Sequence, residues 1–191
     1  HQPEYLFLRT AKAFAKMLEK KLPEFKINIL TTEQYTKANP NFKRGQIVDL
    51  VAKNEIQMSQ TEVWELGEHT QDKNFLVFDM PWLFKDHNHA RRVLEGPIGQ
   101  AINNRLAKKI GVRGLAYTYS GGYRTIGANS SIKNLSDLAT KTIRVNGNPI
   151  TREYWESLGV NVTRQRTSRL GGEFSDLELP EGVDGKDTTY I

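Results

Sequence analysis

The chain has 191 residues, of which 38% are hydrophobic and 26% charged, and its formal net charge is +5. This size and composition exclude a disordered protein, because such a chain can bury a core. It contains no cysteine, which excludes disulfides and thiolate metal sites, and no apolar run is long enough to cross a membrane. Basic residues are scattered among acidic ones along the chain, which argues against a nucleic-acid interface.

The first third of the chain predicts alternating helices and strands. Apolar residues recur at helical spacing over 4–22, and Pro23 ends that pattern. The stretch FKINIL, residues 25–30, alternates as a β-strand does. The elements expected next are a polar loop over 31–45, a short amphipathic helix over 45–54 and a strand over 55–61.

The middle of the chain combines an apolar run with a long helical pattern. Residues 75–84, FLVFDMPWLF, predict a buried strand that its proline interrupts. Residues 86–109 predict a helix for which Asp86 is the N-cap. Gly96 and Pro97 should divide this segment into two helices.

The last third continues the alternation and weakens after residue 164. An extended β passage is expected over 112–129, with a strand near 115–127 that crosses between two lobes or forms a β-bulge at its glycines. The later elements expected are a short helix within 131–140, strands over 141–145 and 160–163, a helix over 148–159 that ends at Gly159, and a weak strand at the end of the chain. Alternation of this kind predicts an α/β fold with a mostly parallel sheet.

Enzyme and metal chemistry find little support in the sequence. Of the four histidines, His87 and His89 are two residues apart at a helix start and so point to different faces. Helix capping explains the DHNH stretch better than a zinc site, which needs three or four ligands. The glycine-rich stretch SGGYRTIG lacks the ending of a phosphate-binding loop. We therefore expect no metal and no cofactor.

Two arginines are the candidate ligand-binding groups. Arg144 lies in the strand KTIRV, on the opposite face from its apolar neighbours, and Asn146 follows at the carboxyl end of that strand. Ligands of open α/β sheets bind beyond such ends, and a guanidinium pairs with a carboxylate through two hydrogen bonds. An edge-strand arginine in water is the alternative for Arg144. Arg124 follows two glycines and is either an interior ligand group or an exposed turn residue.

Glu62 follows the predicted strand 55–61 and leaves two interpretations open. Its carboxylate could accept hydrogen bonds from ligand hydroxyls. Alternatively, it is an acid in the first turn of a helix, where the helix dipole favours a negative charge.

Several stretches in order resemble one family. The segment FDMPWLFKDHNHARRVLEGPIGQAI and the block from GLAYTYSGGYRTIG to KTIRVNGNPI are similar to the solute-binding proteins of TRAP transporters, of the dicarboxylate-binding (DctP) type. The opening FAKMLEKKLPEFKINIL and the later LGVNVT and EGVDGKDTT match further landmarks of that family. The resemblance covers nearly the whole chain.

The resemblance implies a periplasmic protein with two α/β lobes, 1–121 and an incomplete 122–191. Such a protein captures a dicarboxylate or a sugar acid between its lobes and delivers it to a membrane permease, without catalysis. The family's ligand arginine corresponds to Arg144, and its second arginine corresponds to Arg124. Glu62 matches a position that contacts hydroxyls in members that bind sugar acids. Thr188 stands where the family usually has an asparagine that reaches the ligand.

Some landmarks of that family are missing from this chain. The strand that precedes the first helix is absent, and so is the long helical section after VDG. The stretch TRQRTSRLGGEF also differs from the apolar run that the family has there. These departures predict that the chain is part of a longer protein, and an exported form would have lost its signal peptide. A small α/β enzyme that acts on an anionic carboxylate is the alternative function.

Overall fold

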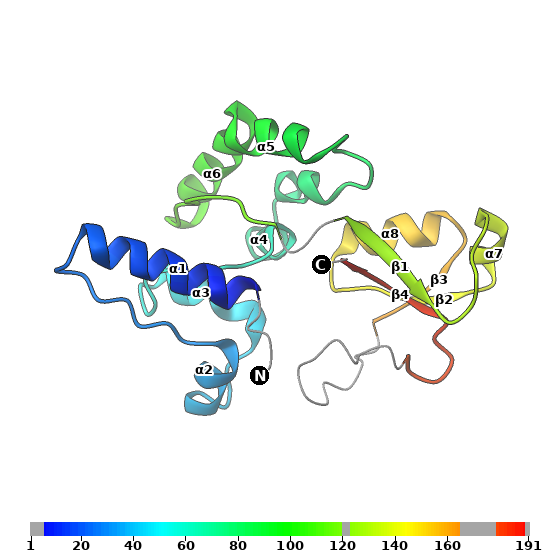
Figure 1. Cartoon of the computed structure of the whole chain (residues 1–191), viewed down its shortest axis with the longest axis horizontal. Coiled ribbons are helices and arrows are strands. Elements are labelled where there is room, and N and C mark those ends of the chain that lie inside the picture. Colours follow the sequence, from blue (N-terminus) through cyan, green and yellow to red (C-terminus); the bar gives the residue numbers. More distant parts are fainter. Residues whose placement is uncertain (1–5, 120–122, 165–178, 190–191) are drawn as a thin grey trace. The chain divides into compact units, whose positions relative to one another are not determined.

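The computed structural model describes residues 6–119, 123–164 and 179–189. The chain divides into two compact units, His1–Thr61 and Glu62–Ile191 (Figure 1). The lobes that the sequence predicts, 1–121 and 122–191, divide the chain elsewhere and stay a prediction.

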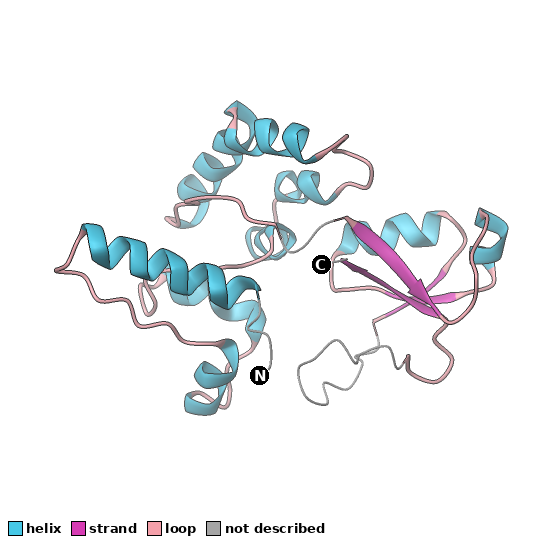
Figure 2. Cartoon of the chain, in the orientation of Figure 1, coloured by secondary structure: helices cyan, strands magenta, loops and turns pink. Residues whose placement is uncertain are grey.

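The described residues of the first unit form helices and loops (Figure 2). The predicted first helix is confirmed, and a capping box between Thr31 and Gln34 starts a helix where the sequence predicted a loop. The strands predicted at 25–30 and 55–61 are wrong, because an extended segment becomes a strand only beside a partner strand and the described part of this unit offers none. The elements of the unit are α1 Leu6–Lys21, α2 Thr32–Ala38, the 3₁₀ helix η1 Arg44–Gln46 and α3 Ile47–Ala52.

The second unit begins with helices that enclose Phe75. This side chain is fully buried and packs with Ile102 and Leu106. The apolar run 75–84 is therefore not the predicted strand: its first part belongs to a 3₁₀ helix, whose N-cap Asp72 accepts a hydrogen bond from the backbone N–H of Asn74. These elements are α4 Val63–Thr70, η2 Lys73–Asp79, α5 His87–Glu95 and α6 Pro97–Ile110.

The predicted division of residues 86–109 is confirmed. The Asp86 carboxylate accepts a hydrogen bond from the backbone N–H of His89 at 2.7 Å, as an N-cap does. Pro97 opens α6, and Gly99 follows where no larger residue fits: a Cβ there would lie 1.8 Å from the carbonyl oxygen of Leu94. The sharp passage from α5 to α6 therefore depends on local sequence alone.

A four-stranded sheet with two helices lies in the later described part of the second unit (Figure 1). The strand order is β1-β4-β2-β3, in which β1 and β4 are antiparallel while β2 is parallel to both of its neighbours. A core on one face includes Ile143, Val145 and Trp155. The mostly parallel sheet, together with its helices, confirms the predicted α/β class. The elements are β1 Arg124–Ala128, α7 Leu135–Ala139, β2 Thr142–Arg144, α8 Pro149–Ser157, β3 Asn161–Thr163 and β4 Gly185–Thr189.

Several predictions for this region are confirmed, and one predicted extended passage contains a shorter strand than expected. Gly159 follows α8 with a left-handed φ of 77°, a conformation that suits glycine after a helix. The weak strand expected at the end of the chain is β4. Of the extended passage 112–129 only β1 is a strand, and residues 120–122 lie outside the described residues.

Candidate functional site

Arg124 is held by a buried carboxylate. Its Nε donates to Oδ1 of Asp187 at 2.7 Å, and its Nη2 donates to the Asp187 carbonyl oxygen at 3.2 Å. Oδ2 of Asp187 accepts a hydrogen bond from the indole N–H of Trp155 at 2.9 Å, and both residues are buried. Within the described residues these bonds use two of the five guanidinium donors of Arg124, which leaves donors for a further acceptor.

The loop between β2 and α8 is shaped by its own asparagines. Oδ1 of Asn146 accepts from the backbone N–H of Asn148 at 3.1 Å, and Oδ1 of Asn148 accepts from that of Ile150 at 2.9 Å. Asn148 is therefore the N-cap of α8, and it is only 2% exposed. Nη2 of Arg164 donates to the carbonyl oxygen of Gly147 at 2.8 Å. The loop is thus fixed at the carboxyl end of β2.

Asp79, the last residue of η2, is a half-buried acid near this loop. Its Oδ2 atom is fully buried and accepts no hydrogen bond from the described residues. Burial raises the pKa of Asp79 from 3.8 to about 6, and the negative charge of Glu62 adds to the rise. The positive charge of Arg124 and hydrogen bonding by Asn148 lower this pKa. Asp79 therefore shares one electrostatic environment with Glu62, Arg124 and Asn148.

Glu62 stands at the start of α4, beside Trp64. The backbone N–H of Glu62 donates to Oε2 of Glu65 at 3.3 Å, and its Oε2 accepts the indole N–H of Trp64. The Trp64 ring lies against Gly147, where an added Cβ would be 2.8 Å from its Cη2 atom. Glu62 is the N-cap of α4, as its helical interpretation expected, and it also adjoins the loop that follows β2.

The pleat of the sheet separates the two arginines. Arg144 pairs in register with Lys186, and Thr188 lies two residues further on the same face. Asp187, the partner of Arg124, faces the other side together with Ile143 and the core. The Nε atom of Arg144 is fully buried. Arg144 and Thr188 thus share one face of the sheet, and Arg124 belongs to the other.

Of the residues that the sequence singled out, Glu62 and Arg124 belong to one polar cluster, and Asn146 adjoins it. We define this cluster as Glu62, Asp79, Arg124, Asn148 and Asp187. Sequence reasoning missed Asp79, Asn148 and Asp187. The only signal was the position of Asn148 directly before a proline that begins a helix, which marks an N-cap.

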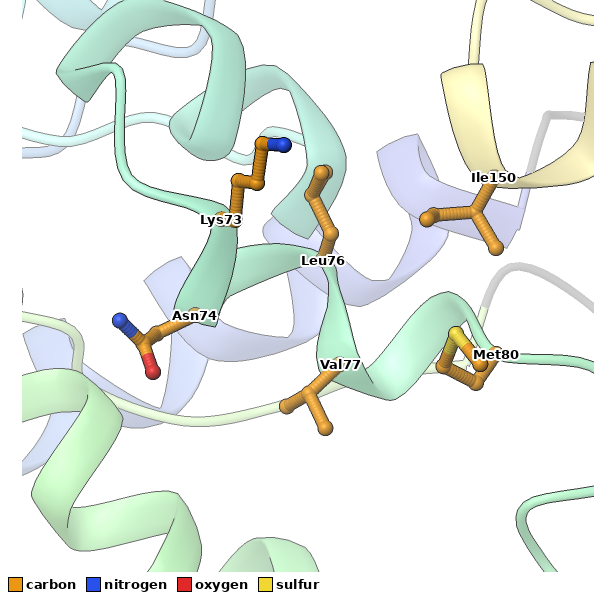
Figure 3. Close-up of a pocket in the computed structure, with 6 residues that line it drawn as sticks. All are labelled: Lys73, Asn74, Leu76, Val77, Met80 and Ile150. Atoms are coloured by element: carbon orange, nitrogen blue, oxygen red, sulfur yellow. The ribbon is translucent and has the colours of Figure 1, made fainter. Parts of the chain in front are cut away.

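A separate pocket of about 410 Å³ lies between η2 and α8 (Figure 3). Most of its lining is apolar, and none of the predicted ligand-binding residues lines it. Its lining residues are Lys73, Asn74, Leu76, Val77, Met80 and Ile150.

Two further features can be assessed in the described residues, a cluster of metal ligands and a helix that crosses a membrane. Within residues 6–119, 123–164 and 179–189, no three His, Asp or Glu side chains gather as metal ligands would. In the same part of the chain, every helix is too short or too polar to span a membrane.

Comparison with known proteins assigns the chain to a family. The model of the DctP family, bacterial extracellular solute-binding protein family 7, matches residues 1–170. The C4-dicarboxylate-binding periplasmic protein DctP of Shewanella loihica is 23% identical over 94% of this chain, which corresponds to 50% of that protein. The chain therefore spans half of the length of this curated relative.

Solved structures share the fold. A TRAP periplasmic solute-binding protein from Xanthobacter autotrophicus with bound β-D-galacturonate is 25% identical, with a TM-score of 0.73 over 97% of this chain and 58% of that one. One from Shewanella oneidensis with bound succinate is 24% identical, with a TM-score of 0.73 over 94% of this chain and 54% of that one. The chain belongs to the DctP family of bacterial extracellular solute-binding proteins.

Proposed function

We propose that this chain is the ligand-capturing part of the extracytoplasmic component of a TRAP transporter, and that it binds the carboxylate of an organic acid. The observation that carries the proposal is the place of Arg144, at the carboxyl end of β2 with its Nε atom buried. A partly desolvated guanidinium at such a position suits a ligand carboxylate, because the pair gains strength where water is excluded.

The other groups have supporting roles in this proposal. Thr188 lies on the same face of the sheet as Arg144 and offers a hydroxyl to the ligand. Asn146 fixes the loop that follows β2, and its side-chain amide adds a donor there. Arg124, which Asp187 holds on the other face of the sheet but toward the same end of it as Arg144, gives a second positive charge, and Glu62 accepts hydrogen bonds from ligand hydroxyls.

The proposed setting is the periplasm, with a TRAP membrane permease as the partner that receives the ligand. The relatives favour this function over the small α/β enzyme that the sequence left open, since they are solute-binding proteins. Solved relatives hold sugar acids as well as dicarboxylates, such as β-D-galacturonate in one and L-malate in another. We therefore propose capture and release of an organic acid without turnover.

The test is calorimetry with a panel of sugar acids, hydroxy acids and dicarboxylates. Arg144→Ala should weaken binding by about 2–5 kcal/mol, the usual cost of removing one partner of a buried charged pair. Arg113→Ala is the matched control, since Arg113 is exposed and lies outside the cluster. If Arg144→Ala folds and binds with unchanged affinity, Arg144 is not the anchor. If no acid on the panel binds the wild type, the proposed function is wrong.

A further inference from the structure

We propose that Arg164 is a specificity-determining residue, which binds the second carboxylate of a short dicarboxylate while Arg144 holds the first. The inference deepens the proposed function and rests on it, since it presumes that an organic acid binds at the carboxyl end of β2. It depends on the position of Arg164, on the contact that holds its side chain and on the charge of its guanidinium.

Arg164 lies at the same edge of the sheet as Arg144. The strands β2 and β3 are parallel, and Thr163, the last residue of β3, pairs in register with Arg144, the last residue of β2. The backbone N–H of Val145 donates to the carbonyl oxygen of Thr163 at 3.0 Å, so the two strands end side by side. Arg164 is the next residue, and it therefore stands at the carboxyl edge of the sheet, where α/β proteins bind ligands.

The side chain of Arg164 reaches across this edge to the loop that follows β2. Its Nη2 atom donates to the carbonyl oxygen of Gly147 at 2.8 Å. Gly147 comes three residues after Arg144, and three residues of extended chain span at most roughly 11 Å. The Arg164 guanidinium therefore lies at the loop into which the strand of Arg144 leads, within reach of a small ligand bound there.

The positive charge of Arg164 is not neutralised by this bond. Gly147 offers a neutral carbonyl oxygen, and no carboxylate of the described residues forms an ion pair with Arg164. Arg124 differs in this respect, because the Asp187 carboxylate already holds it. The bond to Gly147 uses one of the five guanidinium donors, and the side chain is exposed, so the other donors are open to water or to a ligand.

A second carboxylate is the ligand group that this guanidinium suits best. A carboxylate accepts two parallel N–H bonds from an arginine and balances its charge, whereas a hydroxyl or an amide leaves the charge unbalanced. The bond to Gly147 also orders the Arg164 side chain before the ligand arrives, which reduces the entropy lost on binding. Arg164 should therefore raise the affinity for a dicarboxylate and leave the affinity for a monocarboxylate nearly unchanged.

The experiment compares succinate with succinamate, in which an amide replaces one carboxylate, by calorimetry at about pH 8, where carboxyl groups are ionised. The wild type should bind succinate about tenfold more tightly, as one added hydrogen bond between charged groups would give. Arg164→Gln, which keeps a donor for the Gly147 carbonyl oxygen but removes the charge, should abolish this preference by weakening succinate binding. Arg152→Gln is the matched control, because Arg152 is an exposed arginine of the same unit that pairs with Glu156 on α8.

The outcomes separate this inference from the function on which it rests. If organic acids bind but the wild type does not prefer succinate to succinamate, the inference is wrong and the function stands. Arg164→Gln changes an exposed side chain and should fold, and a wild-type preference in this variant also overturns the inference. An equal loss of preference in Arg152→Gln overturns it too, because the general charge of the protein would then be the cause. If no organic acid binds at all, the function and the inference both fail.

Discussion

Arg124 and Asp187 are 63 positions apart in sequence and are joined by a 2.7 Å hydrogen bond between Nε and Oδ1. The antiparallel pairing of β1 with β4 brings them together, since Asp187 lies opposite Ile126, two residues from Arg124. Trp155 fixes the second carboxylate oxygen of Asp187. The direction of the Arg124 guanidinium is therefore set before any ligand arrives.

The first prediction concerns this pair. Asp187→Asn should weaken organic-acid binding about tenfold, because Arg124 and Trp155 bond to different oxygens of Asp187 and the amide replaces one of these oxygens with an NH₂ group that cannot accept. Calorimetry on the single and double variants measures the effect. In the Arg124→Ala background the same change should have little effect on affinity, if Asp187 acts through Arg124. Equal losses in the two backgrounds would show that Asp187 acts only on the fold.

The second prediction concerns pH and stability. The pKa of Asp79 is raised from 3.8 to about 6, so the folded protein binds more protons than the unfolded chain between these values. The free energy of unfolding should therefore contain a contribution from Asp79 that falls as pH rises from about 4 to about 6, by up to ~3 kcal/mol. Asp79→Asn should remove this dependence in urea titrations. If the free energy of unfolding of Asp79→Asn keeps the wild-type dependence on pH, the dependence does not come from Asp79.

The third prediction concerns Asp72, which is 5% exposed and pairs with Arg105 and Lys109. Hydrogen bonding by Arg105 and Asn74 holds the pKa of Asp72 well below its usual range. Asp72→Ala should destabilise the fold by about 2 kcal/mol, because it removes the N-cap of η2 as well as the ion pairs. The exposed pair of Arg91 and Glu95 provides the control, and Arg91→Ala should cost under about 1 kcal/mol. If chemical denaturation shows the same loss of stability for Asp72→Ala and Arg91→Ala, this prediction is wrong.

The fourth prediction concerns Gly147. A Cβ at this position would lie 2.8 Å from the Trp64 ring, so Gly147→Ala should displace the ring and with it the carboxylate of Glu62. We expect a loss of stability of about 1–3 kcal/mol and weaker ligand binding. Gly127→Ala is the matched control, because nothing lies within 4 Å of a Cβ there. Wild-type melting temperature and affinity in Gly147→Ala would show that the contact is unimportant.

The parts of the fold that depend only on residues adjacent in sequence could be predicted from the sequence. Asp86 as a cap and the break at Gly96 and Pro97 are examples, since each acts within one turn of helix. The apolar run 75–84 could not be assigned, because a buried 3₁₀ turn and a buried strand have the same composition. The strand predicted at 25–30 failed for a related reason, since pairing depends on a distant partner.

The residues of the candidate site could likewise be predicted only in part. The place of Arg144 at the end of a strand could be predicted from the adjacent sequence, and its role as a ligand anchor stays a prediction. Asp187 could not, because its role follows from the pairing of β1 with β4. Asp79 was overlooked since it stands inside an apolar run, where its burial beside Glu62 and Asn148 depends on how η2 packs. The sequence singled out Arg124 and the family resemblance gave it a ligand role, whereas the carboxylate that holds it comes from the structure.

The asparagine-fixed loop between β2 and α8 has a thermodynamic consequence. Its backbone N–H groups at Asn148 and Ile150 are already bonded to side chains of the loop itself, so a ligand need not order this segment. The conformational entropy lost on binding should be small here, and the association rate should not be limited by folding of the loop. Breaking this arrangement, as in Asn148→Ala, should therefore appear as a larger unfavourable entropy of binding.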